Sequence, residues 1–316
     1  MILVAGVPQE RPTAMVIEAL DAISASFRIF DQRRFREADI SVEIGDAAAG
    51  GTVGGTLWLN GETLRLESVE AIYLRLMDDN LLPQVAEMSP ATPERRHCRR
   101  FHELLMDFAA IVPARVLNRP ADMASNRSKP FQAHAIREVG FDIPETLITN
   151  HIPSASDFIQ SAWIAGYDVV YKSMSGIRSI VQTVKKEDLA RLEHIRWCPT
   201  QFQRRVLGTD IRVHVVGDTA LASEIDSVAT DYRYANRQTG TEPSFRPIRL
   251  DVSTRARCVR LAQRLRLPLA GIDLRRTVGG RHVCFEVNPS PAFSFYEDRT
   301  GLPIAETIAR YLAGET

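Results

Sequence analysis

The stretch of sequence that decides the fold lies near the C-terminus and reads GIDLRRTVGGRHVCFEVNP over residues 271–289. A strand that carries an acid, Asp273, leads through a Gly-Gly turn to a second strand that carries Glu286 and Asn288. Residues two apart on a strand point to the same face, so Glu286 and Asn288 project together, and Asp273 joins them if the hairpin folds back. Hard oxygen ligands on a rigid sheet suit Mg²⁺, which takes one or two carboxylates and completes its shell with water and phosphates. The spacing therefore indicates a metal site, with surface acids on an ordinary hairpin as the alternative.

The composition is ordinary for a soluble globular protein. The chain has 316 residues, of which 45% are hydrophobic and 25% are charged, and its formal net charge is zero. This length suggests more than one domain, and the neutral charge gives no sign of a nucleic-acid partner or of a membrane partner. No apolar run approaches the ~20 residues that span a bilayer, and Met1–Gly6 does not have the pattern of a signal peptide. Cys98, Cys198, Cys258 and Cys284 lie far apart without metal-ligand spacing, which is typical of reduced thiols in a cytoplasmic protein.

The pattern of apolar residues predicts a mixed α/β chain in three units, over residues 1–115, 116–198 and 199–316. In the first unit we expect strands over 2–5, 27–30, 56–59, 63–66 and 69–76, with helices over 12–23 and 90–111. In the second unit we expect helices over 126–138, 154–162 and 185–192, with strands over 143–149, 167–172 and 179–184. Ser154 or Ser156 is expected to cap the helix over 154–162. In the third unit we expect strands over 200–206, 211–216, 220–227, 269–274 and 283–287, with helices over 255–265 and 301–312.

Lysine is rare in this chain, and two of the lysines stand at informative places. Of the 39 basic residues, four are Lys, and Lys185 and Lys186 open a helix where solvent is expected around them. Lys172 ends a strand and is followed by small residues that include Ser175, so an ammonium group and free backbone N–H groups can cradle a phosphate chain. A surface lysine before a turn is the alternative. Lys129 begins a helix, where a cation opposes the macrodipole and is favoured only if an anion lies nearby.

A segment in the last third combines hydrogen-bonding backbone with paired charges. The extended run Gln203-Arg204-Arg205-Val206 can present backbone N–H and C=O groups to an adenine edge. Asp210 and Arg212 share a strand face, so Asp210 can accept from ribose hydroxyls and Arg212 can clamp a phosphate or a carboxylate, unless the charges form a cross-strand ion pair. Arg233 follows Asp231 at the same spacing, and it either faces the metal site as part of a basic cleft or has a structural role.

Other patterns exclude common enzyme classes. His214 and His282 read as structural because neither pairs with a Ser or Cys nucleophile. The turn over residues 6–9 lacks the glycine fingerprint of a dinucleotide-binding fold. The arginines over residues 95–100 read as a solvated helix face, with a docking surface for an acidic partner as the alternative.

Taken in order from about Asn118 to the C-terminus, these parts resemble the ATP-grasp superfamily. Lys129 and Lys172 look like its two nucleotide-binding lysines, with Ser173–Gly176 as the phosphate loop and Gln203–Val206 as the adenine hinge. Asp210-Ile211-Arg212 is similar to a strand motif of the ribosomal-protein-S6 glutamate-ligase branch. The metal ligands of that branch match Asp273, Glu286 and Asn288.

Further motifs are more similar to the graspetide synthetases, microviridin-type ATP-grasp ligases that mature ribosomally made peptides. These motifs are Asn118-Arg119-Pro120, Lys129-Pro130-Phe131-Gln132, Pro144–Asn150, Gln201-Phe202-Gln203, Ile225-Asp226-Ser227, Asp231-Tyr232-Arg233 and Thr300–Ile304. The first ~110 residues also resemble the pre-ATP-grasp domain of that family. Two segments depart from its pattern, Arg204-Arg205 after the hinge glutamine and Pro291–Tyr296 after the metal motif, which leaves the acceptor open.

The resemblance implies an ATP-grasp fold in which a pre-ATP-grasp α/β domain precedes two α+β subdomains that clamp ATP and Mg²⁺, with two ions expected. It implies an ADP-forming ligase that turns a carboxylate into an acyl phosphate, which an amine or hydroxyl then attacks. Lys129 and Lys172 would bind phosphates, and Arg212 with Arg233 would stabilise the acyl phosphate and its tetrahedral successor.

Three functions stay open from the sequence. The first is a ligase that forms ester or amide crosslinks in a peptide precursor, and the second is a small-molecule or α-L-glutamate-type amino-acid ligase. The third is a non-catalytic ATP-binding switch, which the complete set of lysines, arginines and metal ligands disfavours. Relatives often form dimers, but no interface can be read from this sequence, so a homodimer also stays open.

Overall fold

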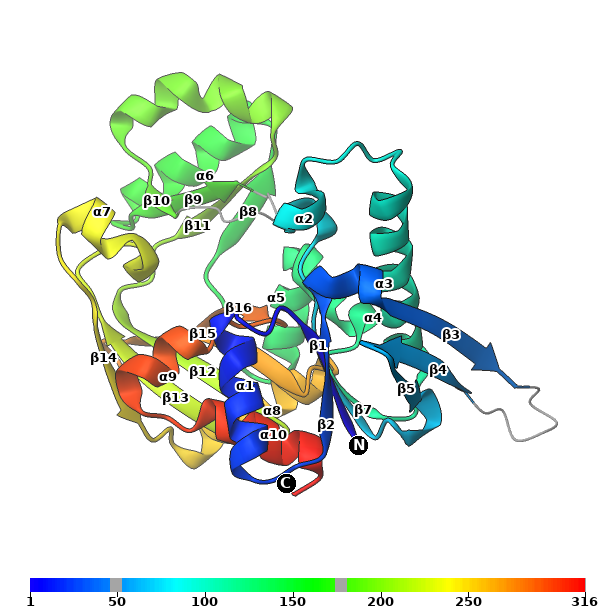
Figure 1. Cartoon of the computed structure of the whole chain (residues 1–316). Helices are drawn as coiled ribbons and strands as arrows, with labels where there is room; N and C mark the ends of the chain where they lie inside the picture. The colour runs from blue at the N-terminus through cyan, green and yellow to red at the C-terminus, as the bar shows by residue number, and fades with distance from the viewer. Residues whose placement is uncertain (46–52, 174–180, 316) are drawn as a thin grey trace.

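A computed structural model of the chain describes residues 1–45, 53–173 and 181–315, and it has the mixed α/β architecture that the sequence predicts (Figure 1). Strands of the described residues form four sheets, in the orders β2-β1-β6-β7, β3-β4-β5, β10-β9-β11-β8 and β14-β13-β12-β15-β16. The N-terminal part occupies one side of the molecule, and the sheet with β8–β11 lies above the sheet with β12–β16 in the view of Figure 1.

The N-terminal part is built on a parallel sheet that consists of β1 (Ile2–Gly6), β2 (Phe27–Asp31), β6 (Ala71–Arg75) and β7 (Arg115–Leu117). Its longer helices are α1 (Arg11–Ala22) and α3 (Pro93–Ile111), and its short ones are η1 (Gln32–Glu37), η3 (Leu66–Ser68), η4 (Asp79–Leu81) and α2 (Pro83–Ala86). The hairpin predicted after residue 55 is confirmed as β4 (Val53–Leu59) and β5 (Glu62–Arg65). The strand β3 (Ala38–Ile44), which the sequence analysis missed, pairs with β4. Asn60 and Gly61 form the turn with φ angles of 52° and 85°, which suits their residue types.

The second sheet is antiparallel and contains β8 (Thr146–Thr149), β9 (Val169–Ser173), β10 (Gln182–Thr183) and β11 (Thr200–Arg204). The helix α6 (Ile152–Ile164) and the 3₁₀ segment η6 (Lys186–Trp197) share one apolar cluster with this sheet. The predicted cap of α6 is wrong, because the helix begins earlier and the His151 side chain accepts from the Ser154 N–H. The strand β11 of this sheet runs from Thr200 to Arg204, which lies beyond the predicted boundary at residues 198/199. The boundary between the second and third units stays a proposal.

The third sheet is also antiparallel and contains β12 (Gly208–Val216), β13 (Thr219–Asp226), β14 (Ser244–Ile248), β15 (Leu269–Thr277) and β16 (His282–Asn288). The segments that accompany it are α4 (Pro120–Met123), η5 (Ala124–Arg127), α5 (Lys129–Glu138), η7 (Tyr232–Tyr234), α7 (Ala235–Thr239), α8 (Val252–Arg264), α9 (Ser294–Thr300) and α10 (Ile304–Ala313). The helices α5 and α8 pack on one face of the sheet. The other face contacts α10, and α9 is a helix that the sequence analysis missed.

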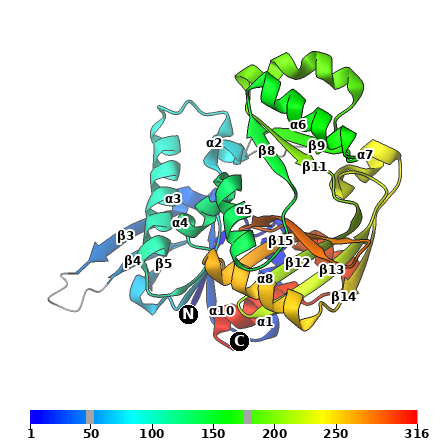
Figure 2. The ribbon, with the colours of Figure 1, turned by 180° about the vertical axis from the view of Figure 1, so that it is seen from behind.

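One apolar cluster joins the N-terminal part to the third sheet. It contains Val4 of β1, Val16 of α1, Val216 of β12, and Ile308 and Leu312 of α10, all of them buried. The helices α1 and α10 lie side by side in both views (Figures 1 and 2). Because the first and last helices share this core, the N-terminal part is anchored directly beside the strands that carry the predicted metal ligands.

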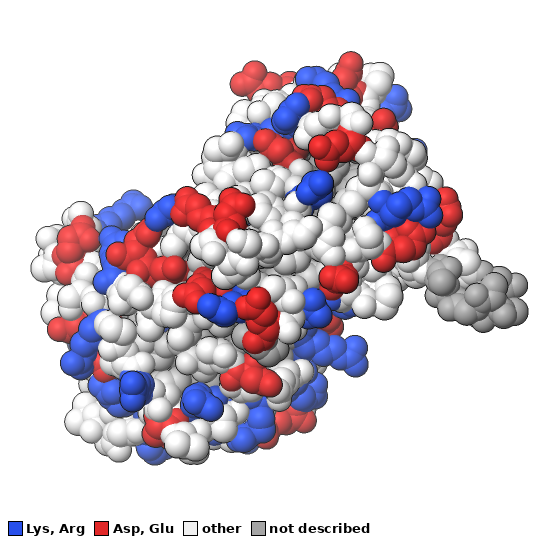
Figure 3. Space-filling view, turned by 60° about the horizontal axis from the view of Figure 1, so that its bottom comes forward, with Lys and Arg blue, Asp and Glu red and all other residues white. Residues whose placement is uncertain are grey.

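Acidic and basic side chains are interspersed over the face seen in Figure 3. None of the helices in the described residues combines the length and the apolar character needed to cross a bilayer.

Candidate active site

The predicted metal hairpin forms as expected. In the antiparallel pair β15–β16, Asp273 lies opposite Glu286 and Gly271 lies opposite Asn288. The register shifts between Asp273 and Leu274, which leaves Phe285 as an extra residue on β16, and such bulges often re-aim side chains beside active sites. The three predicted ligands are therefore gathered at one end of the hairpin, and metal binding itself stays a prediction.

Two lysines from different segments meet on one carboxylate oxygen. Lys129 at the start of α5 and Lys172 on β9 place their Nζ atoms 3.1 Å and 3.2 Å from Glu286 Oε2. Burial alone raises the pKa of Glu286, but the charges of Lys172 and Lys129 outweigh this and hold it at about 2. The anion that Lys129 requires at a helix N-terminus is thus Glu286, and the carboxylate is ionised at neutral pH.

Arg212 is buried beside the same hairpin. Its Nη1 atom donates to Asp273 Oδ1 at 2.7 Å across the β12–β15 pair, and its guanidinium lies 5.6 Å from the centre of the Tyr296 ring. A Cβ atom on Gly271 would lie 2.1 Å from Arg212 Nη2, so the guanidinium occupies the space that the glycine leaves. His214, two residues further along β12, is fully buried, and its ring nitrogens have no hydrogen-bond partner among the described residues. Burial lowers the pKa of His214, which supports its predicted structural role.

The remaining predicted charges are engaged in ion pairs. Asp210 binds the Arg275 guanidinium through both oxygens, at 2.7 and 2.9 Å, so the cross-strand ion pair that was the alternative interpretation is present. Arg275 also donates to the Val206 carbonyl at 2.8 Å, which uses an acceptor of the predicted adenine hinge. Arg233 binds both oxygens of Asp231 at 2.9 and 2.7 Å, and these hydrogen bonds raise its pKa.

The predicted hinge begins on β11, an inner strand of the second sheet, and continues beyond the end of that strand at Arg204. The Gln203 amide donates to Thr146 Oγ1 at 2.9 Å, and Arg204 pairs with Glu145 at 2.9 Å while lying 5.1 Å from the Tyr167 ring centre. Ser175 of the predicted phosphate loop lies outside the described residues.

A cavity of about 110 Å³ between the second and third sheets brings these residues together. It is lined by Val170, Lys172, Val181, Gln203, Arg204, Arg205, Val206, Asp210, Thr230, Asp231, Tyr232, Arg233, Asp273, Arg275, Phe285 and Glu286. A larger cavity of about 1030 Å³ shares Gln203 and Phe285 with it and adds Lys129 and one face of α5. The predicted nucleotide residues that the structure describes thus line one cavity or the other.

Two buried amides that the sequence analysis did not assign hold the ligand-bearing strand. Asn118 donates to the carbonyls of Leu269 and Pro289, both at 2.6 Å, and accepts from the Leu269 N–H at 3.0 Å. Gln132 donates to the Val287 carbonyl at 2.7 Å and accepts from the Val287 N–H at 3.2 Å. Both amides stand inside motifs quoted above, but a role in support of the strand had no local signal in the sequence.

The residues present fit Mg²⁺ and a polyphosphate. Asp273 uses Oδ1 for Arg212 and Glu286 uses Oε2 for the lysines, so among the described contacts each carboxylate keeps its other oxygen. Asn288 Oδ1 accepts a single described hydrogen bond, from the Ser290 N–H at 2.9 Å. No cluster of three or more His, Cys, Asp or Glu suited to a metal occurs in the described ranges. Two carboxylates and an amide oxygen, with further ligands from phosphate and water, are the donor set that Mg²⁺ favours.

Comparison with known proteins identifies the family. Residues 124–312 match the model of the RimK-like ATP-grasp domain. The chain belongs to this family. A probable α-L-glutamate ligase of Pseudomonas aeruginosa is 28% identical over 205 residues, which cover 62% of this chain and 66% of that protein. A protein of the same name from Serratia proteamaculans is 26% identical over 205 residues, with the same coverage. The chain therefore spans slightly less than two thirds of the length of these relatives.

Solved structures of peptide-modifying ATP-grasp ligases share the fold over the whole chain. The macrocyclase MdnC of Microcystis aeruginosa, bound with its precursor peptide MdnA, has a TM-score of 0.80 at 22% identity and covers 100% of both chains. A ligase of Chryseobacterium gregarium in complex with ADP and leader and core peptides has a TM-score of 0.84 at 22% identity, over 100% of this chain and 97% of that one. The ligase PsnB with minimal precursor, Mg and ADP has a TM-score of 0.77 at 26% identity, over 99% and 96%. The similarity includes the N-terminal part, which the family match over residues 124–312 leaves out.

Proposed function

We propose that this chain is an ADP-forming ligase that uses Mg-ATP to activate a carboxylate and joins it to an amine or hydroxyl of a ribosomally made peptide. The observation that carries the nucleotide chemistry is the convergence of Lys129 and Lys172 on Glu286, beside Asp273 and Arg212. Support for the peptide substrate comes from the fold shared with ligases whose structures contain precursor peptides, over nearly the whole of each chain. We also propose that the protein works in the cytoplasm.

In the proposed reaction, a carboxylate oxygen of the peptide attacks the γ-phosphorus of ATP and ADP leaves. An amine or hydroxyl then attacks the carbonyl carbon of the acyl phosphate, loses its proton and releases phosphate, so the peptide loses one water for each ATP used. The protein contributes position and charge stabilisation rather than covalent chemistry.

Each residue of the site has a part in this scheme. Lys129 and Lys172 leave Glu286 to bind phosphate oxygens, while Gln203, Arg204 and Val206 hold the adenine and Asp210 lies near the ribose. Ser175 is proposed to contact the phosphates. Arg212, held by Asp273, and Arg233, held by Asp231, stabilise the negative charge of the acyl phosphate.

Asp273, Glu286 and Asn288 would hold Mg²⁺, with two ions proposed. Bound there, Mg²⁺ would supply positive charge that offsets the negative charge developing on the transferred phosphate. Before the nucleotide binds, the charges of Lys172 and Lys129 lower the pKa of Glu286 and keep its carboxylate ionised. A bound cation would favour the same ionised form once the lysines turn to phosphate.

An amino-acid ligase is the second candidate function. A relative named as a probable α-L-glutamate ligase is 28% identical over 205 residues, and the family match over residues 124–312 includes Lys129, Arg212 and Glu286. A ligase of this kind would turn over free amino acids without any peptide.

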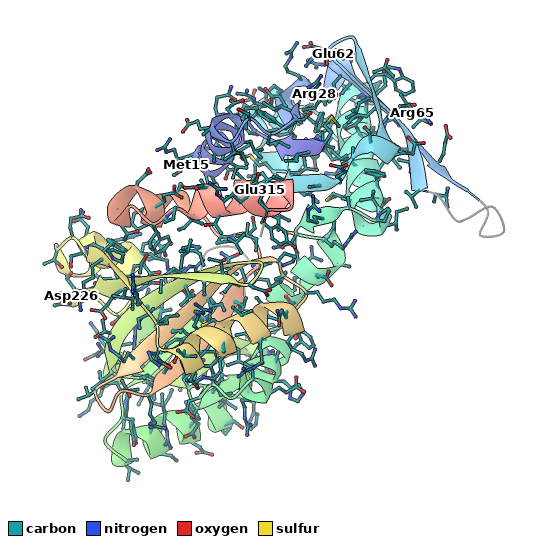
Figure 4. All side chains as sticks on the ribbon, turned by 90° about the horizontal axis from the view of Figure 1, so that it is seen from below. Met15, Arg28, Glu62, Arg65, Asp226 and Glu315 are labelled. Carbon is teal, nitrogen blue, oxygen red and sulfur yellow. The ribbon has the colours of Figure 1, made fainter. Side chains whose placement is uncertain are left out.

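The test is coupled ADP release by the purified protein with Mg-ATP. Short peptides encoded beside the gene and pools of free amino acids are offered separately, and peptide products are weighed by mass spectrometry. Glu286→Gln removes a proposed ligand, and Glu62→Gln is the matched control because Glu62 pairs with Arg28 on the distant N-terminal surface (Figure 4).

ADP release that a peptide stimulates, with loss of water from that peptide, supports the proposal. Stimulation by a free amino acid alone moves the protein to the second candidate function. Retention of ADP release in Glu286→Gln, when Glu62→Gln behaves like the unaltered protein, contradicts the assigned site.

A further inference from the structure

Arg75, the last residue of β6, connects the N-terminal part to the candidate active site. Its Nε and Nη2 atoms bind the two oxygens of Glu10 at 2.8 Å each, and its Nη1 atom donates to Ser290 Oγ at 3.0 Å. Nη1 also lies 3.4 Å from the Pro291 carbonyl oxygen. The side chain is 12% exposed, so this bridge is shielded from solvent.

Ser290 passes the contact on to a proposed metal ligand. Its backbone N–H donates to Asn288 Oδ1 at 2.9 Å, and this bond fixes the direction of the amide oxygen. The hydroxyl of the same residue is the acceptor for Arg75. The result is a continuous chain of hydrogen bonds from Glu10 through Arg75 and Ser290 to Asn288.

The other supports of this segment come from elsewhere in the chain. Asn118 holds the Pro289 carbonyl and Gln132 holds both backbone groups of Val287. Among the hydrogen bonds of the described residues, the bonds of Arg75 are the ones that reach residues 286–291 from the parallel sheet of β1, β2, β6 and β7. Among the described hydrogen bonds, the N-terminal sheet therefore reaches residues 286–291 through the side chain of Arg75.

Arginine suits this part because its planar fork can bind a carboxylate through two N–H groups while a third points elsewhere. Glu10 takes the two parallel bonds and so fixes the guanidinium plane, which aims Nη1 at Ser290. A lysine at this position would carry its three donors on a single nitrogen, so it could not bind both oxygens of Glu10 through parallel bonds and fix a plane.

We propose that Arg75 is a positioning residue for Asn288, and that through it the N-terminal part raises the affinity of the site for the divalent cation that accompanies the nucleotide. The proposal rests on the proposed function, because it requires Asn288 to be a metal ligand. Groups that orient metal ligands without touching the metal commonly change metal affinity 10–100-fold when they are removed.

The test measures Mn²⁺ binding, by electron paramagnetic resonance, to the full-length protein saturated with ADP. We expect Arg75→Gln and Ser290→Ala each to weaken Mn²⁺ binding by about 10-fold. The Mn²⁺ affinity of Arg75→Lys should lie between that of Arg75→Gln and that of the unaltered protein. Binding of ADP without metal should change less than 2-fold. Arg28→Gln is the control, because Arg28 lies on the same parallel sheet and pairs with exposed Glu62 far from the site (Figure 4).

A double variant separates positioning from general damage. If Arg75 acts through Ser290, the Arg75→Gln and Ser290→Ala double variant binds Mn²⁺ no more weakly than the weaker single variant, because both changes break the same link. Effects that multiply in the double variant, or Mn²⁺ binding in Arg75→Gln equal to that of Arg28→Gln, overturn the proposal while the proposed function stands. If the unaltered protein does not bind ADP, or binds ADP but no Mn²⁺, the proposed function is overturned and this inference with it.

Discussion

Replacing Gly271 with alanine should displace Arg212 and strongly reduce turnover while leaving the nucleotide site in place. The added Cβ would lie 2.1 Å from Arg212 Nη2, 2.6 Å from Arg212 Cζ and 2.8 Å from Pro291 Cβ. The end of an arginine side chain is normally flexible, but this one is 5% exposed, bound to Asp273 and stacked against Tyr296. The guanidinium therefore cannot move aside without losing these contacts.

The expected loss of stability follows from two contributions. Overpacking of a buried site costs about 1–3 kcal/mol, and loss of a hydrogen bond between charged groups costs about 1.5–3 kcal/mol. The two costs do not add in full, because a guanidinium that moves away relieves the clash but loses its bond to Asp273. We therefore expect the free energy of unfolding, measured by urea titration, to fall by about 3 kcal/mol. If Arg212 stabilises charge in the transition state, peptide-stimulated ADP release should fall by about 100-fold or more.

Gly279→Ala is the matched control in the same hairpin. A Cβ at Gly279 meets nothing within 4 Å, so its effect on stability should stay within about 0.5 kcal/mol. Unchanged stability in Gly271→Ala would refute the reasoning that the glycine makes room for Arg212. Lower stability with unchanged ADP release, measured where the variant is still folded, would refute the catalytic part assigned to Arg212.

Two further predictions concern protonation and the choice of lysine. Burial lowers the pKa of His102 to about 4, so below about pH 6.5 the unfolded chain takes up a proton that the folded protein does not. Stability should therefore fall as the pH drops from 6.5 towards 4, by about 2.5 kcal/mol at pH 4.5, and His102→Gln should remove this part of the loss in urea titrations at pH 7.5 and 4.5. An equal loss in both proteins would contradict the assignment. Lys172→Arg should weaken ATP binding by about 10-fold although it keeps the charge, because a guanidinium can bind Glu286 in bidentate fashion and hold it. Calorimetric titration with ATP measures this, and an affinity equal to that of the unaltered protein would count against it.

Local sequence patterns predicted the parts of the site that lie on one element. The two-residue period of a strand predicted that Glu286 and Asn288 share one face. The Gly-Gly turn predicted a hairpin, and in the structure this hairpin places Asp273 opposite Glu286. The helix start at Lys129 was equally visible, because a cation there requires an anion nearby. The identity of that anion was not visible, since Glu286 lies 157 residues away and nothing local records which strand end faces the helix.

What the sequence could not supply is register between distant strands. The pairing of Arg212 with Asp273 and of Asp210 with Arg275 depends on how β12 aligns with β15, and a shift of one residue would turn these side chains to the other face. For the same reason the link from Arg75 to Ser290 had no signal, because 215 residues separate its partners. The missed strand β3 and helix α9 are elements stabilised by packing against neighbours rather than by a strong local pattern.

The distribution of arginine and lysine in the site follows from what each group can do. Arg75, Arg233 and Arg275 each bind both oxygens of one carboxylate, which fixes the geometry of the site before any ligand arrives. Lys129 and Lys172 instead share one oxygen of Glu286 through single contacts, on flexible stems that can turn to another anion. Phosphate groups would replace this shared carboxylate as the partner of both lysines and leave Glu286 free to bind a cation. The chain uses arginine at 35 of its 39 basic positions, and we propose that Lys129 and Lys172 are lysines because each has to exchange its partner when the nucleotide binds.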